Sequence, residues 1–158
     1  MNKQQFIRNV ELCQKEVRRF LTALCNGEIS LAEDLAQDSF VKAYLNIDKI
    51  NDESKFKAWI YRIAYNTFLS HTRTVRNKST LSDAYDMISD DTPEHKFRYQ
   101  SLYNALSMLP EKIRSAILLY YMSGYTIKEI AEITDCTEET VRQQLSRGRK
   151  HLKGLLVE

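Results

Sequence analysis

The sequence has 158 residues, 43% of them hydrophobic, and a formal net charge of +2 at pH 7. This length allows one domain or two small ones, each with enough apolar content for a core. The three cysteines show no CxxC or paired Cys/His spacing, which argues against a disulfide framework and against a zinc site. With no N-terminal signal pattern and no apolar run long enough to span a membrane, we expect a cytoplasmic protein without metal or cofactor.

The charges are distributed unevenly along the chain. Residues 1–80 carry an excess of four positive charges, residues 81–96 an excess of four negative charges, and residues 97–158 an excess of two positive charges. This pattern predicts two basic lobes joined by an acidic connector.

The first half of the chain predicts three helices. Apolar residues recur at threes and fours from Lys3 to a stop at Asn26-Gly27. Ser30 and Glu33 have the spacing of a capping box and predict a second helix through about residue 46. Residues 47–54 break the pattern and predict a polar loop, after which helical spacing returns with Trp59 as an expected core anchor.

Two surfaces of these helices allow more than one interpretation. Asp34 and Asp38 lie one turn apart with Gln37 between them, so they could bind a basic partner or simply be a solvated helix start that favours the helix dipole. Residues 55–82 hold six bases and no acid. Tyr61 and Tyr65 within this stretch suit stacking on single-stranded nucleic acid, but they could equally be an i,i+4 pair that covers the core.

Residues 77–96 are rich in polar and acidic side chains and predict an at least partly flexible linker. Helical spacing resumes at Tyr99, and Pro110 is positioned to start a further helix that ends at Gly124. No segment alternates long enough for a strand. The predicted fold is therefore all-α, with two small helical lobes joined by a flexible linker.

Residues 124–152 have the pattern of a helix-turn-helix. Thr126 and Glu129 form a capping box, and Asp135 can adopt the left-handed backbone of a turn. Thr137 caps the next helix, whose expected buried face comprises Val141, Leu145, Gly148 and Leu152. That helix is basic, since residues 142–153 hold five bases and no acid. The pattern is typical of a DNA reader, and a plain helical hairpin with a solvated outer face is the alternative.

Four segments together resemble an extracytoplasmic-function sigma factor in their order and spacing. They are AEDLAQDSF (32–40), FKAWIYRIAYN (56–66), LPEKIRSAILLYYMSGYTIKEIAEI (109–133) and TVRQQLSRGRKHL (140–152). The resemblance implies a bacterial initiation factor, not an enzyme, that binds core RNA polymerase, directs it to promoter DNA and opens the duplex. It divides the chain into sigma region two (1–76), an acidic linker (77–96) and sigma region four (97–158).

The same resemblance implies the site residues and a regulator. Those of the polymerase-binding helix are Asp34, Gln37 and Asp38. Those of the specificity loop and melting helix, for the minus-ten element, are Asn51, Asp52, Ser54, Tyr61, Arg62, Tyr65, Asn66 and Arg73. Those that read the minus-thirty-five element are Thr137, Glu138, Glu139, Arg142, Gln143 and Arg147. An anti-sigma partner, often membrane-tethered in this group, is also implied.

Two other classes of function compete with this prediction. A stand-alone helix-turn-helix regulator would bind duplex DNA without polymerase, but it has no need for the AEDLAQDSF segment or an aromatic and basic helix. A hydrolytic enzyme is disfavoured because the histidines at 71, 95 and 151 are scattered and the sequence has neither an HExxH motif nor a nucleophile elbow.

Overall fold

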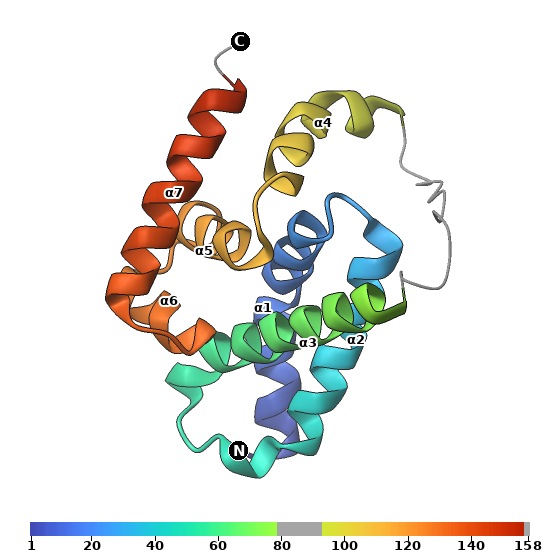
Figure 1. Ribbon diagram of the computed structural model, residues 1–158. Helices are drawn as coiled ribbons and strands as arrows, with labels where there is room; N and C mark the ends of the chain where they lie inside the picture. The colour runs from blue at the N-terminus through green and yellow to red at the C-terminus, as the bar shows by residue number, and fades with distance from the viewer. Residues whose placement is uncertain (79–92, 157–158) are drawn as a thin grey trace.

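A computed structural model describes residues 1–78 and 93–156, and over these ranges the chain is helical with no strand (Figure 1). This confirms the all-α prediction. The predicted linker lies largely on residues 79–92, outside the described residues, while the flanking helices reach to Lys78 and from Pro93. The elements are α1 (Lys3–Leu24), α2 (Ile29–Leu45), the 3-10 turns η1 (Ile47–Lys49) and η2 (Glu53–Lys55), α3 (Phe56–Lys78), α4 (Pro93–Ser107), α5 (Glu111–Tyr121), α6 (Ile127–Thr134) and α7 (Glu138–Leu156).

Helices α1 to α3 form the N-terminal lobe. The predicted stop after α1 is confirmed, since Asn26 and Gly27 both have left-handed backbones, with φ of 58° and 87°. The predicted capping box at Ser30 is wrong. Helix α2 begins at Ile29 without a side-chain cap, and the Glu33 carboxylate instead pairs with the Arg18 guanidinium of α1 at 2.8 Å.

Helices α4 to α7 form the C-terminal lobe, in which α6 and α7 make the predicted helix-turn-helix. Thr126 and Glu129 form the reciprocal capping box. Asp135 is left-handed with φ of 55°, and the Thr137 hydroxyl accepts a hydrogen bond from the Thr140 amide at 3.1 Å. These three predictions of local geometry are confirmed.

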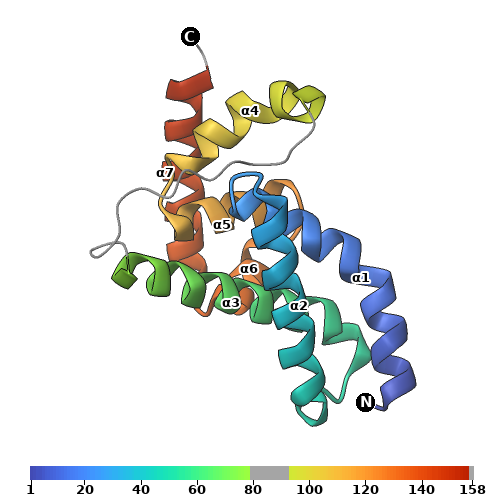
Figure 2. The same cartoon turned by 90° about the vertical axis from the view of Figure 1, so that its right-hand side faces the viewer.

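The two lobes pack directly on each other. Figures 1 and 2 both show α6 lying against α3 and α5 lying beside α1. Buried side chains from both lobes belong to one continuous hydrophobic cluster that includes Phe20 and Tyr61 of the N-terminal lobe and Leu119 and Ile130 of the C-terminal lobe. The arrangement is therefore closed, with the inner face of each lobe covered by the other. None of the helices in the described ranges has the length and hydropathy needed to cross a bilayer.

Candidate nucleic-acid interface

The acidic face of α2 points outward. Helix α2 buries Leu35, Ala36 and its other small residues against α1 and α3, which leaves the intervening positions on the surface. The exposed residues include the three predicted polymerase contacts, Asp34, Gln37 and Asp38.

This face continues with two apolar side chains that the sequence analysis did not single out. Val41 and Leu45 are 59% and 75% exposed. They follow Asp38 at steps of three and four, so they share its side of the helix. The signal that could have revealed them is an apolar residue on the face opposite the buried one. An acidic patch with an adjacent apolar surface is well suited to binding a protein.

The loop between α2 and α3 is held by its own side chains. Asn51, Asp52 and Ser54 are all exposed, and Ile50 anchors the loop in the core. The Asp52 carboxylate accepts hydrogen bonds from the Ser54 hydroxyl at 2.7 Å and from the Ser54 amide at 3.0 Å. These bonds lower the pKa of Asp52, so the carboxylate stays ionised. Asp52 and Ser54 therefore shape the loop as well as lining its surface.

A pocket of about 310 Å³ lies between the end of α2 and α3. Among the residues that line it are Lys42, Asn46, Lys49, Trp59 and Asn66. Of the predicted minus-ten residues only Asn66 lines this pocket. Trp59, the expected core anchor, packs against the hydrophobic core but is only half-buried, and its remaining surface lines the pocket. Amides, lysines and an indole can hydrogen-bond and stack a nucleobase. The signal available in the sequence was a tryptophan in one predicted helix together with basic residues at the end of the helix before it.

Tyr61 and Tyr65 lie in the contact between the lobes and are only 1% and 3% exposed. The Tyr61 ring packs edge-on against the Tyr125 ring with centroids 5.1 Å apart, and the Tyr61 hydroxyl accepts a hydrogen bond from the Ser123 hydroxyl at 3.3 Å. Burial raises the pKa of Tyr61 and of Tyr65 to about 12. In the closed arrangement both rings cover the core, which is the alternative that the sequence left open. Neither face is open to a base.

The polar residues of α3 divide into two groups. The Arg62 guanidinium donates to the Glu132 carbonyl at 3.2 Å and lies 3.9 Å from the Asp135 carboxylate, so it is held by the helix-turn-helix. Asn66 and Arg73 are exposed further along α3. Among the described residues, the structure thus leaves two of the five predicted α3 residues open to solvent without a hydrogen bond or ion pair to the other lobe.

Helix α7 differs from α3 because its predicted DNA-contact residues remain exposed. Helix α7 buries Val141 and Leu145 completely, and Gly148 packs so closely on α5 that an added Cβ would lie 2.6 Å from Ile117. Thr137 is engaged in the helix cap through its hydroxyl. The outward side carries all the predicted minus-thirty-five residues, Thr137, Glu138, Glu139, Arg142, Gln143 and Arg147, each of them exposed.

A buried arginine connects the lobes, and the sequence analysis did not identify it. The Arg114 guanidinium donates to the carbonyls of Leu106 at 2.9 Å and Leu109 at 3.0 Å in its own lobe, and to the carbonyl of Leu24 at 2.7 Å in the other. Leu24 ends α1, where carbonyls lack intrahelical partners and a cation is favourable. Arg114 therefore acts as a cap for a helix of the opposite lobe.

Two family descriptions match the chain, one in each lobe. "Sigma-70 region 2" matches residues 10–78, and "Sigma-70, region 4" matches residues 99–152. The two matches together span well over half of the chain.

Curated relatives agree with these matches. The chain is 32% identical over 152 residues to the ECF RNA polymerase sigma factor SigM of Bacillus subtilis, covering 92% of this chain and 91% of SigM. It is 35% identical over 135 residues to the ECF RNA polymerase sigma-E factor of Haemophilus influenzae, covering 76% of this chain and 71% of that protein.

Solved structures share the whole arrangement. The sigma factor RpoE from Bartonella quintana, in complex with the anti-sigma factor NepR, superimposes with a TM-score of 0.80 at 30% identity, covering 96% of both chains. CnrH, in complex with the cytosolic domain of CnrY, has the same fold, with a TM-score of 0.73 at 21% identity over 98% of this chain and 89% of CnrH.

Proposed function

The chain belongs to the extracytoplasmic-function sigma factors of the sigma-70 family, and from this membership we propose how its surfaces divide the work of promoter recognition. As a sigma factor it binds core RNA polymerase and directs it to specific promoters. The observation that carries this conclusion is the match of both sigma regions within one chain that also aligns along nearly its whole length with SigM. A stand-alone regulator has no use for region two, and nothing in the matches favours one.

We propose that residues 1–76 act as region two and residues 97–158 as region four, with residues 77–96 as the connection. The exposed face of α2 docks on polymerase through Asp34, Gln37 and Asp38, with Val41 and Leu45 supplying apolar contact. The protein works in the cytoplasm beside its polymerase and has no catalytic residue of its own.

The minus-thirty-five element is assigned to α7, whose basic side chains suit the major groove. Arginine can donate two hydrogen bonds to guanine and glutamine can pair with adenine, which makes Arg142, Arg147 and Gln143 the expected base readers. Glu138 and Glu139 can accept from the amino group of cytosine, and Thr137 borders the backbone.

The minus-ten element is assigned to the loop and to α3. Asn51, Asp52 and Ser54 border the unpaired strand, with Asn66 in the pocket beside them and Arg73 on the phosphates. Tyr61, Tyr65 and Arg62 can join only after the lobes part, since Tyr61 and Arg62 contact region four and Tyr65 is buried. Flipping a base costs a few kcal/mol, so stacking partners are needed at that step.

An anti-sigma protein is the proposed regulator. Both solved neighbours are sigma factors captured in complex with an anti-sigma protein, NepR in one case and the cytosolic domain of CnrY in the other. The closed arrangement of this chain matches theirs closely in fold, so it is a suitable target for a partner of the same class.

Run-off transcription with purified core polymerase on a library of promoter fragments tests the proposal. Specific initiation is expected with the protein and not without it, and Asp38→Arg is expected to abolish it by repelling the basic partner surface. Glu11→Arg is the matched control, since Glu11 is an exposed acid on α1 rather than on α2. Equal losses in both variants, or no initiation with the unaltered chain, would contradict the assignment.

A further inference from the structure

The N-terminal end of α1 lies beside the loop that joins α2 to α3 (Figures 1 and 2). Phe6 of α1 is buried, and its ring packs edge-on against Tyr44 near the end of α2 and against Phe56 at the start of α3, with centroids 5.5 Å and 5.7 Å apart. Aromatic pairs in this geometry add to the stability that burial alone provides. One side chain of α1 therefore contacts both of the helix ends between which the loop runs.

The second half of the loop is bound to α1 by polar contacts. The Asn9 side-chain amide donates to the Glu53 carboxylate at 3.1 Å and to the Gln5 carbonyl at 2.7 Å, so it is fixed to its own helix while it holds the loop. The Arg8 guanidinium lies 3.6 Å from the same carboxylate oxygen. Both members of this ion pair are exposed, so its contribution is small. The position of Glu53 therefore depends chiefly on the hydrogen bond from Asn9.

Glu53 lies between two residues that we propose to border the unpaired strand, Asp52 and Ser54. These two bind each other, which sets the local shape of the loop but does not attach it to a neighbouring helix. Ile50 attaches the first half of the loop to the core, and Glu53 attaches the second half to α1. The same contact holds the Glu53 carboxylate against α1, whereas a carboxylate turned toward the strand would repel its phosphates.

We propose that Asn9, assisted by Arg8, is a positioning residue for minus-ten specificity, because through Glu53 it holds the loop in the place from which the loop selects a base. The inference rests on the proposed function and adds to it a residue of α1, a helix to which no promoter contact is assigned. Asn9 acts through the loop and makes no contact with DNA itself.

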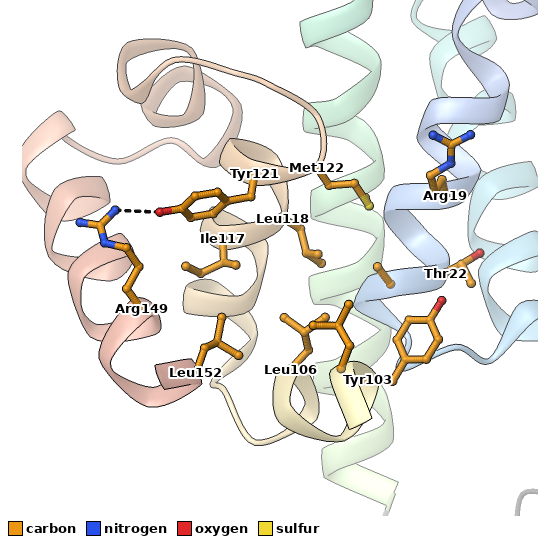
Figure 3. Close-up of a pocket in the computed structure, with 12 residues that line it drawn as sticks. Arg19, Thr22, Tyr103, Leu106, Ile117, Leu118, Tyr121, Met122, Arg149 and Leu152 are labelled. Carbon is orange, nitrogen blue, oxygen red and sulfur yellow. Dashed lines mark hydrogen bonds between the residues drawn. The ribbon is translucent and has the colours of Figure 1, made fainter. Parts of the chain in front are cut away.

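The contact between the lobes involves the other end of α1. Figure 3 shows Arg19 and Thr22 of α1 at one wall of an apolar groove of about 810 Å³, facing residues of α4, α5 and α7. Asn9 precedes Arg19 by ten residues, which is about 15 Å along the helix axis. A substitution at Asn9 is therefore expected to change the loop without changing how the lobes pack on each other.

The variant Asn9→Asp tests this role, because it replaces the donor amide with a carboxylate that faces the carboxylate of Glu53. Run-off transcription with core polymerase, on a promoter library randomised at the minus-ten element, measures the preference for the favoured base over the others. We expect this preference to fall at least about threefold, the equivalent of one lost hydrogen bond. In a library randomised at the minus-thirty-five element, the preference should stay within about twofold, since α7 is unchanged.

A second substitution distinguishes positioning from a general weakening of α1. Adding Glu53→Gln to Asn9→Asp should restore the minus-ten preference to within about twofold of the unaltered chain, because the amide at position 53 can donate to the carboxylate at position 9. Glu53→Gln alone should also stay within about twofold, since its amide oxygen can still accept from Asn9.

Glu11→Gln is the matched control for this rescue. It makes the same change from carboxylate to amide at an exposed residue of α1, and residues two positions apart on a helix do not face each other. Adding Glu11→Gln to Asn9→Asp should therefore leave the minus-ten preference as low as in Asn9→Asp alone.

The outcomes separate this inference from the function on which it rests. If the unaltered chain initiates specifically, then an unchanged minus-ten preference in Asn9→Asp, an equal loss in the minus-thirty-five library, or a failure of Glu53→Gln to rescue would overturn the positioning role alone. If the unaltered chain initiates at no promoter with core polymerase, the sigma function is rejected and the positioning role with it.

Discussion

The two surfaces that we propose to read DNA differ in their exposure. On α7 the predicted readers Arg142, Gln143 and Arg147 all face solvent, whereas on α3 the predicted readers Tyr61 and Tyr65 are buried under the other lobe. Both surfaces belong to helices whose opposite sides pack into the core, so helix formation alone does not cause the difference. Its cause is the contact between the lobes, which covers one surface and leaves the other free.

This difference separates recognition of duplex DNA from melting. A major groove can be read by a helix that is already exposed, while an unpaired base needs aromatic faces that are accessible. On the proposed assignment, promoter opening therefore requires a rearrangement of the lobes that minus-thirty-five recognition does not. Each of the following predictions changes either the contact between the lobes or the packing of α7 and leaves the other unchanged.

The largest effect is expected from removal of the arginine that joins the lobes. Arg114→Met should lower the free energy of unfolding by about 2–4 kcal/mol, because hydrogen bonds from a charged donor are lost and buried carbonyls are left unpaired. Urea denaturation measures this loss, and hydrogen exchange should quicken at the end of α1. Lys112→Met, an exposed site on the same helix, is the control. Unchanged exchange in α1 would mean that the contact with Leu24 does not join the lobes.

The next largest loss of stability is expected where α7 packs on α5. Gly148→Ala should destabilise the protein by about 1–3 kcal/mol through overpacking, since its Cβ would lie 2.6 Å from Ile117. Gly154→Ala in the same helix has no atom within 4 Å of its added Cβ and should be neutral or stabilising by up to about 1 kcal/mol. Thermal unfolding of the pair checks the contrast, which equal effects would refute.

Alkaline pH should lower the free energy of unfolding because Tyr65 is buried in its protonated form. Burial raises the pKa of Tyr65 from 10.0 to about 12, so between these values the unfolded chain has released a proton that the folded chain keeps. The contribution is complete below pH 10 and is lost as pH rises toward 12. Urea midpoints measured from pH 9 to 11 should fall less steeply in Tyr65→Phe than in the unaltered chain. Exposed Tyr120→Phe should not change the slope.

The smallest effect is expected at the partner of Tyr61. The Tyr125 hydroxyl is buried and has no hydrogen-bond partner among the residues that the structure describes, so Tyr125→Phe should be neutral or stabilise the protein by up to about 1 kcal/mol. Chemical denaturation tests this value. A loss above about 1 kcal/mol would show that the hydroxyl has a partner in solution and that the contact between the lobes is more polar than the structure indicates.

Local geometry could be predicted from the sequence because its causes are local. The Thr126 capping box and the left-handed Asp135 depend on neighbours three or four residues away, and both predictions were confirmed. The Ser30 cap failed because α2 already begins at Ile29, and Glu33 has a partner on another helix, Arg18, that no local pattern reveals. Resemblance to a known family supplied the site residues, which remain predictions.

The contact between the lobes could not be predicted because its partners are far apart in the chain. Ser123 meets Tyr61 across 62 positions, and Arg114 meets Leu24 across 90. A lone arginine in a sequence is ordinarily taken as a surface residue, since the carbonyls that make its burial tolerable are visible only in the folded chain. The same lack of information left the role of Tyr61 open.

The contacts that Arg62 makes with the helix-turn-helix also affect how promoter DNA would reach it. Its guanidinium, proposed as a contact of the melted strand, already faces a carbonyl of Glu132 and the carboxylate of Asp135. These oxygens imitate a phosphate, and they are tethered to the same chain, so their effective concentration is on the order of millimolar. If Arg62 contacts the melted strand as proposed, the DNA has to displace these oxygens, which favours strands delivered by a polymerase already bound nearby over DNA encountered freely in solution.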